Sequence, residues 1–218
     1  MNPDRTEMIT FRAAEADDLD QFYGISLATG HHGADASHLY DDPKMIGHIY
    51  SAPYLKLAPH LCFVAVDDFG VPGFIVGALD THSFERLLED EWWPALRAIY
   101  DEPNEELSAD WSADQIRSFM IHHPERTPVE LARSYPAHLH MNLLPRIQRQ
   151  GTGPKLLNLW LDNARELGAT AVHLGASSRN AGAIRFWKRH GFKPLDDLID
   201  RPSSRTKWLG RSIYTKGP

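Results

Sequence analysis

The chain has 218 residues, of which 42% are hydrophobic and 24% are charged, a composition that fits one globular domain with a substantial core. A formal net charge of -6 excludes the basic face that nucleic-acid binding needs. The single cysteine, Cys62, excludes an internal disulfide and is expected to be a buried strand residue. No basic leader precedes an apolar stretch, and no segment approaches the roughly 20 apolar residues of a membrane span. We therefore expect a soluble, cytoplasmic protein without a membrane or nucleic-acid partner.

The first 80 residues predict an N-terminal unit of strands and helices. Apolar alternation, helical spacing of apolar residues and turn-forming residues define its elements. In chain order they are a strand at 8–12, a helix at 13–28, a helix near 43–50, and two strands at 61–66 and 73–79. The last two strands flank Asp67, Asp68 and Gly70, which predicts an antiparallel hairpin.

Residues 81–136 predict a helical insertion between the third and fourth strands. Its three expected helices cover residues 83–100, 113–122 and 128–134. The acidic run at 101–114 favours a solvated surface over a recognition patch.

The C-terminal half predicts alternating strands and helices. In chain order these are a strand at 137–144, a helix at 154–167, a strand at 171–175, a helix at 180–190, and strands at 192–197 and 208–214. The fold class is therefore α/β (α+β): one mixed, mostly antiparallel twisted sheet with helices on both faces. One domain spans 1–218, divided at residues 80, 136 and 192 into the N-terminal part, the insertion, a ligand-binding core and C-terminal strands.

A two-glycine loop opens the helix at 154–167 and reads Gln148-Arg149-Gln150-Gly151-Thr152-Gly153. Its bare backbone lets several N–H groups converge on an anion at the positive end of the helix, although an ordinary tight turn would read the same way. No Lys-Ser/Thr follows the second glycine, and no third glycine leads to a distant acidic residue. The loop is thus neither a Walker loop nor a Rossmann fingerprint.

With its flanking elements, this loop resembles the acetyl-CoA-binding core of the GCN5-related N-acetyltransferase family. Asn180 matches the asparagine that contacts the pantetheine arm in the family, and the run from Ile184 to Phe192 matches its aromatic, Gly-Phe ending. The resemblance implies that acetyl-CoA is the acyl donor, with pyrophosphate on the loop and the pantetheine arm along the strand at 137–144. The implied cofactor-binding residues are Met141, Leu143, Leu144, Gln148, Arg149, Gln150, Gly151, Thr152, Gly153, Lys155, Asn180, Phe186 and Trp187. The side chains of Arg149 and Lys155 would either neutralise phosphate charge or be solvated.

A second resemblance covers most of the chain. The segments at 53–55, 61–80 and 89–94 are similar to the acetyltransferase-like domain at the C-terminus of O-GlcNAcase and to its stand-alone bacterial relatives. The eukaryotic domain is degenerate at its glycine loop, whereas Gly151 and Gly153 are both present here. The resemblance therefore implies a fold and CoA binding but leaves the acceptor amine unidentified.

One position departs from the family pattern. Trp187 stands where the family usually has a tyrosine that protonates the departing thiolate, and an indole N–H is far too weak an acid for that step. Solvent or another group must supply the proton, or turnover is poor. The alternative function is therefore a non-catalytic module that binds acyl-CoA or another protein.

Two residues are candidate catalytic bases for acetyl transfer to an amine. His140 lies on the polar face of its strand with His138 and Asn142, opposite Leu139, Met141 and Leu143, and has an ordinary pKa suited to proton transfer. Asp80 follows an apolar strand, so its carboxylate is either a base or the cap of the next helix. A backbone N–H near Met141 or Leu143 is the expected oxyanion donor.

Other polar clusters suggest no metal site. His31, His32 and His38 lie near several aspartates, but no paired ligand spacing on an expected helix is present. The acidic balance is compatible with a cationic amine acceptor and is also common in soluble proteins. The expected function is direct acetyl transfer from acetyl-CoA to an amine-bearing small molecule or peptide, and the family resemblance suggests a homodimer.

Overall fold

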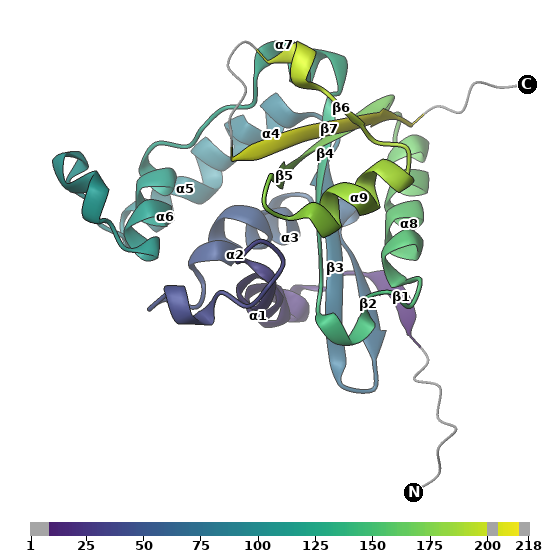
Figure 1. The fold of residues 1–218 in the computed structure, drawn as a ribbon, viewed down its shortest axis with the longest axis horizontal. Helices are drawn as coiled ribbons and strands as arrows, with labels where there is room; N and C mark the ends of the chain where they lie inside the picture. Colours follow the sequence, from purple (N-terminus) through teal and green to yellow (C-terminus); the bar gives the residue numbers. More distant parts are fainter. Residues whose placement is uncertain (1–8, 200–204, 214–218) are drawn as a thin grey trace, which may run out of the picture.

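The computed structural model describes residues 9–199 and 205–213, which form one seven-stranded sheet with helices on both faces (Figure 1). The strands are β1 (Thr10–Ala13), β2 (Phe63–Asp67), β3 (Gly70–Ala78), β4 (Ala137–Leu143), β5 (Ala171–Ser177), β6 (Lys193–Pro194) and β7 (Thr206–Ser212). They lie in the order β1-β2-β3-β4-β5-β7-β6. Among these strands, β4 and β5 pair in parallel and the others are antiparallel, which confirms the predicted fold class.

The helices follow the predicted order. They are α1 (Leu19–Thr29), α2 (Met45–Tyr50), α3 (Ala52–Leu57), α4 (Thr81–Leu87), α5 (Trp93–Arg97), α6 (Ala113–His122), α7 (Val129–Ser134), α8 (Thr152–Glu166) and α9 (Ala181–Arg189). Helix α3 was not expected as a separate element. Helix α1 begins six residues later than predicted, whereas α2, α6, α7, α8 and α9 begin and end within two residues of their predicted bounds.

Two predicted elements are wrong in extent. The expected helix at 83–100 is divided into α4, a π-helical turn at Leu88–Trp92, and α5. Pro94 has no N–H to donate to a carbonyl one turn earlier, so a continuous α-helix cannot pass through it unchanged. The expected strand at 192–197 is only two residues long, because Asp196–Leu198 forms a 3₁₀ turn.

Parts of two other predictions lie outside the described residues. These are Met8, at the start of the first expected strand, and Tyr214, at the end of the last one. Their described parts are β1 and β7, and β7 begins earlier than predicted, at Thr206.

Alternating residues of the central strands build two cores. On one face, α8 packs across β2 and β3 with its apolar stripe, which includes Leu157 and the fully buried Trp160. On the other face, α1 and α3 pack against the sheet, and the rings of Phe22 and Phe74 stack with centroids 4.5 Å apart. Both faces of the sheet are buried because successive side chains of a strand point to opposite sides of the sheet.

A glycine in β3 sets how closely α8 approaches the sheet. A Cβ on Gly77 would lie 2.3 Å from the carbonyl oxygen of His138 and 2.6 Å from the ring of Trp160. Trp160 itself donates its indole N–H to the carbonyl of Leu61 at 3.1 Å. Any side chain at position 77 would therefore push α8 away from β3 and β4.

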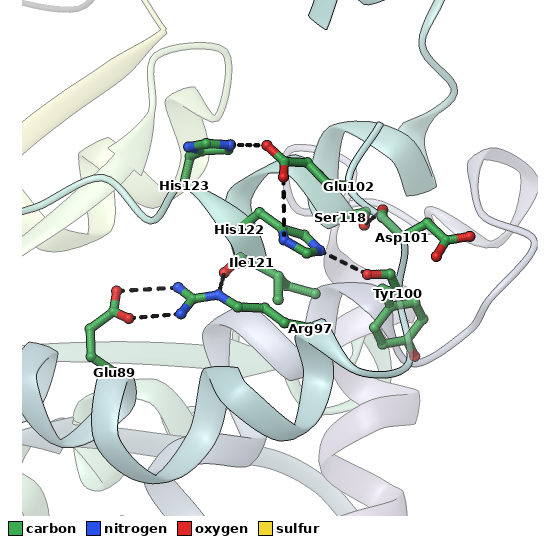
Figure 2. Close-up of polar contacts among 9 residues, drawn as sticks. All are labelled: Glu89, Arg97, Tyr100, Asp101, Glu102, Ser118, Ile121, His122 and His123. Atoms are coloured by element: carbon green, nitrogen blue, oxygen red, sulfur yellow. Dashed lines mark hydrogen bonds and ion pairs between the residues drawn. The ribbon is translucent and has the colours of Figure 1, made fainter. Parts of the chain in front are cut away.

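Polar contacts bind the helical insertion together (Figure 2). The guanidinium of Arg97 donates to both carboxylate oxygens of Glu89, at 3.0 and 3.3 Å, and its Nε donates to the carbonyl of Ile121 at 2.9 Å. The carboxylate of Glu102 contacts the rings of His122 and His123. These contacts join the π-helical turn, α5 and α6 into one unit beside the sheet.

Within residues 9–199 and 205–213, every helix is too short or too polar to cross a bilayer.

Candidate active site

Strands β4 and β5 separate after a short parallel contact. They pair only at Ala137 with Val172 and at His138 with His173, although β4 continues to Leu143 and β5 to Ser177. Beyond that point both strands line a cavity of about 770 Å³. The strands thus leave backbone groups of β4 unpaired on the side of the sheet that faces β5.

The cavity also draws on helices that are distant in sequence. Its wall includes Tyr50 and Tyr54 from α2 and α3, residues of α4 and the π-helical turn, and Arg117 from α6. Its volume lies within the range of small-molecule sites, and it combines aromatic walls with a few polar groups, as such sites usually do.

The glycine loop lies at the start of α8, and two glutamine side chains of the loop donate to backbone carbonyls of the residues before it. Gln148 donates from Nε2 to the carbonyl of Leu143 at 2.8 Å, and Gln150 donates to the carbonyl of Arg146 at 2.7 Å. Arg146 pairs with Asp67 at 2.8 Å, and this hydrogen bond lowers the pKa of the Asp67 carboxyl. The two glutamine side chains are therefore engaged within the protein.

The two loop glycines have different structural roles. Gly151 has a φ of 79°, and a Cβ there would meet nothing within 4 Å, so this position faces open space in a conformation that favours glycine. A Cβ on Gly153 would lie 3.1 Å from the ring of Phe186, so Gly153 lets α8 pack against α9. Arg149 also has a positive φ, of 61°. Backbone of this kind before a helix points N–H groups toward a bound anion.

A buried hydroxyl lies at the start of α8. Thr152 is 2% exposed, and its Oγ1 has no hydrogen-bond partner among the described residues. Buried polar atoms are rarely left unsatisfied, and this hydroxyl has less than 1 Å² of accessible surface. The side chain of Lys155 points toward β1, where its Nζ lies 5.7 Å from the ring centroid of Phe11.

The remaining implied cofactor residues line the separation between the strands or lie near it. Met141 is half-buried and lines the cavity, and the amide of Leu144 donates to the carbonyl of Pro72 at 2.8 Å. Asn180 lines the cavity too, and its Oδ1 accepts from the amide of Ala183 at 3.0 Å, which caps α9. A Cβ on Gly33 would lie 2.7 Å from Nδ2 of Asn180, so the loop after α1 reaches across to α9.

Trp187 is buried at the junction of α9 and the sheet. It is 5% exposed, lines the cavity, and packs edge-on against Phe186 and Phe192 with centroids 5.0 and 5.1 Å apart. The large indole is therefore accommodated as part of the core.

His138 and His140 lie on the cavity face of β4, but their surroundings differ. The hydroxyl of Thr81 donates to the carbonyl of Pro136 at 2.7 Å, so it accepts from Nδ1 of His138 at 2.8 Å. Nε2 of His138 then accepts from the hydroxyl of Tyr54 at 2.7 Å. Both ring nitrogens of His138 are thus engaged, and burial lowers its pKa well below the ordinary value.

The ring of His140 lies beside two tyrosine rings. Its centroid lies 5.8 Å from that of Tyr50 and 5.4 Å from that of Tyr54. No residue in the described part of the chain hydrogen-bonds to its ring, which lines the cavity. Burial lowers the pKa of His140 to about 4, so its imidazole is neutral near pH 7 and has an unprotonated nitrogen.

The other catalytic candidate, Asp80, lies outside the cavity. Its exposed carboxylate accepts from the amide of Ser83 at 2.7 Å and caps α4, and its pKa is lowered by hydrogen bonds from Ser83. It borders a separate, shallow depression of about 190 Å³. The structure thus gives Asp80 the capping role that the sequence left open and brings only His140 into the cavity.

Sequence reasoning missed three polar groups of the cavity. His173 in β5 contacts the carbonyl of Tyr135 through Nδ1 at 2.7 Å, and burial lowers its pKa to about 4. Tyr54 lies in the segment 53–55 that carries the resemblance to the O-GlcNAcase domain, but that resemblance gave it no role, and Arg117 comes from a helix without a motif. A histidine inside the apolar strand 171–175 was a further available signal.

The histidines near α1 form a ring cluster rather than a metal centre. The His31 ring lies 4.8 Å from that of His32 and 5.7 Å from that of His38. Within the described ranges, no three histidine, cysteine, aspartate or glutamate side chains are arranged to hold a metal ion.

Comparisons with known proteins identify the family. Residues 10–192 match the model of the acetyltransferase (GNAT) family, so the chain belongs to that family. The crystal structure of SsHAT superposes with a TM-score of 0.86 at 33% identity and covers 95% of this chain and 99% of that one. The structure of yncA from Salmonella typhimurium, which contains its cofactor acetyl-CoA, has a TM-score of 0.52 at 16% identity, with 96% of each chain covered. This second likeness concerns the fold alone.

Protein O-GlcNAcase from Rattus norvegicus and that from Mus musculus are each 22% identical over 186 residues, or 80% of this chain. The match spans only about a fifth of their length. These findings confirm the family and the relationship that the sequence predicted.

Proposed function

We propose that this protein is an acetyl-CoA-dependent N-acetyltransferase that transfers an acetyl group directly to an amine held in the cavity. The observation that carries the proposal is the separation of β4 from β5, which opens into the cavity and leaves β4 backbone groups free. Membership of the acetyltransferase family and the open, positive-φ backbone of Gly151 support it.

The chain has residues that can bind each part of acetyl-CoA, the acetyl donor. The N–H groups around Gly151 and Thr152 hold the pyrophosphate, and the free edge of β4 near Met141 and Leu143 holds the pantetheine arm and the oxyanion. Asn180 and Phe186 border the same path. Acetyl-CoA, when bound, supplies the acetyl group as a thioester.

We assign the base to His140. Its neutral imidazole accepts the proton that the amine nitrogen loses as the new nitrogen–carbon bond forms. Asp80 is the alternative base, but its carboxylate is engaged in capping α4 and faces away from the cavity lining. Solvent supplies the proton for the departing sulfur, because Trp187 cannot.

No covalent enzyme intermediate is part of this proposal. Cys62 is fully buried, its Sγ lies 3.5 Å from the carbonyl oxygen of Ala58, and burial raises the pKa of its thiol. A protonated, inaccessible thiol is a poor nucleophile.

The second candidate function is a binding module that holds an acyl-CoA or a protein without efficient turnover. Trp187 favours this reading, since it replaces the acid of the family with a core residue. We also propose that the protein is a cytoplasmic homodimer that acts without a membrane or nucleic-acid partner. Light scattering during size-exclusion chromatography tests the dimer.

Two measurements test the proposed function. Calorimetry measures the affinity for acetyl-CoA and CoA, and a thiol reagent follows CoA release with a mixed panel of primary amines. We expect binding and amine-dependent thiol release. Binding without release for any amine would leave the module as the function, and the absence of binding would defeat both the enzyme and the acyl-CoA module.

A further inference from the structure

Arg117 places a guanidinium on the cavity wall, and no carboxylate in the described part of the chain pairs with it. Its Nε donates to the hydroxyl of Tyr40 at 3.1 Å, and its Nη1 approaches Sδ of Met120 at 3.0 Å and the hydroxyl of Tyr50 at 3.5 Å. Its Cζ lies 5.5 Å from the ring centroid of Tyr50. All of these partners are neutral. They position a partly buried cation but do not compensate its charge.

Two of the three carboxylates that line the cavity, those of Glu85 and Glu89, already accept hydrogen bonds. Glu89 forms two hydrogen bonds with Arg97 (Figure 2). Glu85 accepts from the amide of Thr127 at 2.8 Å and contacts Nδ1 of His82 at 3.0 Å. Glu125, which also lines the cavity, is exposed next to the exposed Arg126. Among the described cavity residues, Glu89 is thus compensated by Arg97 and Glu85 already accepts two hydrogen bonds, whereas Arg117 is a cation with only neutral partners.

Burial without a counter-charge is costly for a side chain that cannot lose its proton. An oxyanion with two acceptor oxygens matches the fork of a guanidinium and forms strong, charge-assisted hydrogen bonds. Helix α6, which carries Arg117, lies on the opposite side of the molecule from α8 and its glycine loop (Figure 1). This guanidinium is therefore unsuited to the pyrophosphate and available to the acceptor.

We propose that the acceptor carries an oxyanion, in the first place a carboxylate, that binds Arg117 while its amine lies at His140. The inference rests on the proposed function, because it names the substrate class of the same site. Tyr50 contacts both groups: its ring centroid lies 5.8 Å from that of His140 and 5.5 Å from Cζ of Arg117, so an acceptor that reaches both must pass along this ring. Amine and carboxylate therefore belong to different ends of an extended molecule, as in an ω-amino acid.

The first test uses the wild-type protein and four acceptors. ε-Aminocaproate carries both groups at opposite ends, norleucine carries both on one carbon, pentylamine lacks the carboxylate, and aminohexyl phosphate replaces the carboxylate by phosphate. We expect kcat/KM for ε-aminocaproate to exceed that for pentylamine by about tenfold or more, with norleucine poor. A higher value for the phosphate would support the oxyanion site and change its natural ligand. A kcat/KM for pentylamine or norleucine equal to that for ε-aminocaproate would overturn the inference.

The second test changes the guanidinium. Arg117→Gln should raise KM for ε-aminocaproate about tenfold or more and leave KM for pentylamine unchanged, and Arg117→Lys should recover part of the loss. Arg133→Gln, which makes the same change at an exposed position on α7, is the matched control. An equal effect of Arg117→Gln on both acceptors would indicate a structural role and refute the proposal.

Binding measurements separate this inference from the proposed function. If acetyl-CoA binds and no amine is acetylated, the enzyme is refuted, and calorimetry of ε-aminocaproate with wild type and Arg117→Gln then decides on the oxyanion site. If Arg117→Gln does not fold, the four-acceptor comparison on wild type decides. Release of thiol with pentylamine as fast as with ε-aminocaproate would leave the enzyme standing and remove the oxyanion site.

Discussion

The hydroxyl of Tyr54 donates a hydrogen bond of 2.7 Å to Nε2 of His138, whose other ring nitrogen donates to Thr81. Tyr54 belongs to α3, His138 to β4 and Thr81 to α4, so one imidazole joins three elements of the cavity wall. The ring of Tyr54 also lies against that of His140. The base that we propose is therefore positioned by a hydrogen-bonded chain in which each donor has an acceptor.

Removing the first donor of this chain should destabilise the protein. Tyr54→Phe leaves the buried Nε2 of His138 without a partner, which costs about 1–3 kcal/mol of unfolding free energy. Urea unfolding measures this loss. Thr81→Val disturbs the same imidazole from its other side, so the double variant should lose less than the sum of the two single losses. If the two losses of unfolding free energy simply add, the hydrogen bonds of Tyr54, His138 and Thr81 do not act as a unit.

The stability of the protein should depend on pH below neutrality. Burial lowers the folded-state pKa values of His138, His140 and His173, whereas the unfolded chain binds protons near the ordinary value of 6.5. Their contribution is thus complete above about pH 6.5 and is lost as pH falls toward about 4. His173 alone accounts for up to about 3 kcal/mol. Urea unfolding across this range checks the slope, and His173→Gln should reduce it.

Replacing the proposed base should slow the chemical step without weakening donor binding. His140→Gln keeps a polar side chain of similar size but cannot take a proton, so kcat should fall by about 10²–10⁴. Calorimetric affinity for acetyl-CoA should stay at the wild-type value. An unchanged kcat would assign proton transfer to another group.

Filling the glycine loop should abolish donor binding. Gly151→Glu places a carboxylate where we expect phosphate and strains a residue of positive φ. Gly168→Glu at the other end of α8 is the control, since its φ is 91° and its surroundings are equally open. Calorimetry with CoA should detect no binding to the first variant and normal binding to the second. Equal affinities would place the pyrophosphate elsewhere.

Asp80 offers a test between capping and catalysis. Asp80→Ser keeps a side-chain acceptor for the amide of Ser83 and should retain both stability and acetyl transfer. Asp80→Ala should lose about 1 kcal/mol of stability with little change in kcat. A loss of kcat in the serine variant that matches that of His140→Gln would restore Asp80 as the base.

Local patterns were sufficient to predict most of the fold. The alternation in β2, β3 and β4 and the apolar stripe of α8 identify which face of each element is buried, and turn residues such as Gly70 mark the hairpin. The division of the helix at 83–100 was missed because helical spacing continues through the π-helical turn, and Pro94 was the one sign in this segment that the hydrogen bonding changes. Local periodicity does not report such a change of register.

The candidate site was predictable only where a motif lay within one segment. The glycine loop and Asn180 met this condition, and His140 followed from the period of β4. Tyr54 and Arg117 did not, because each is an ordinary helical residue until packing brings α3 and α6 to the cavity. Chain segments far apart in sequence meet at the cavity, and no local sequence pattern predicts which segments these are.

The order of the sheet has a consequence for synthesis on the ribosome. Because β5 contacts β4 at two residue pairs but pairs with β7 along its full length, its backbone depends chiefly on a strand made later. Until Ser212 has left the exit tunnel, one wall of the cavity is an open edge that another nascent chain could join. Cofactor and acceptor thus meet a finished pocket only after translation of β7, and a stop codon before Thr206 should yield aggregated rather than merely inactive protein.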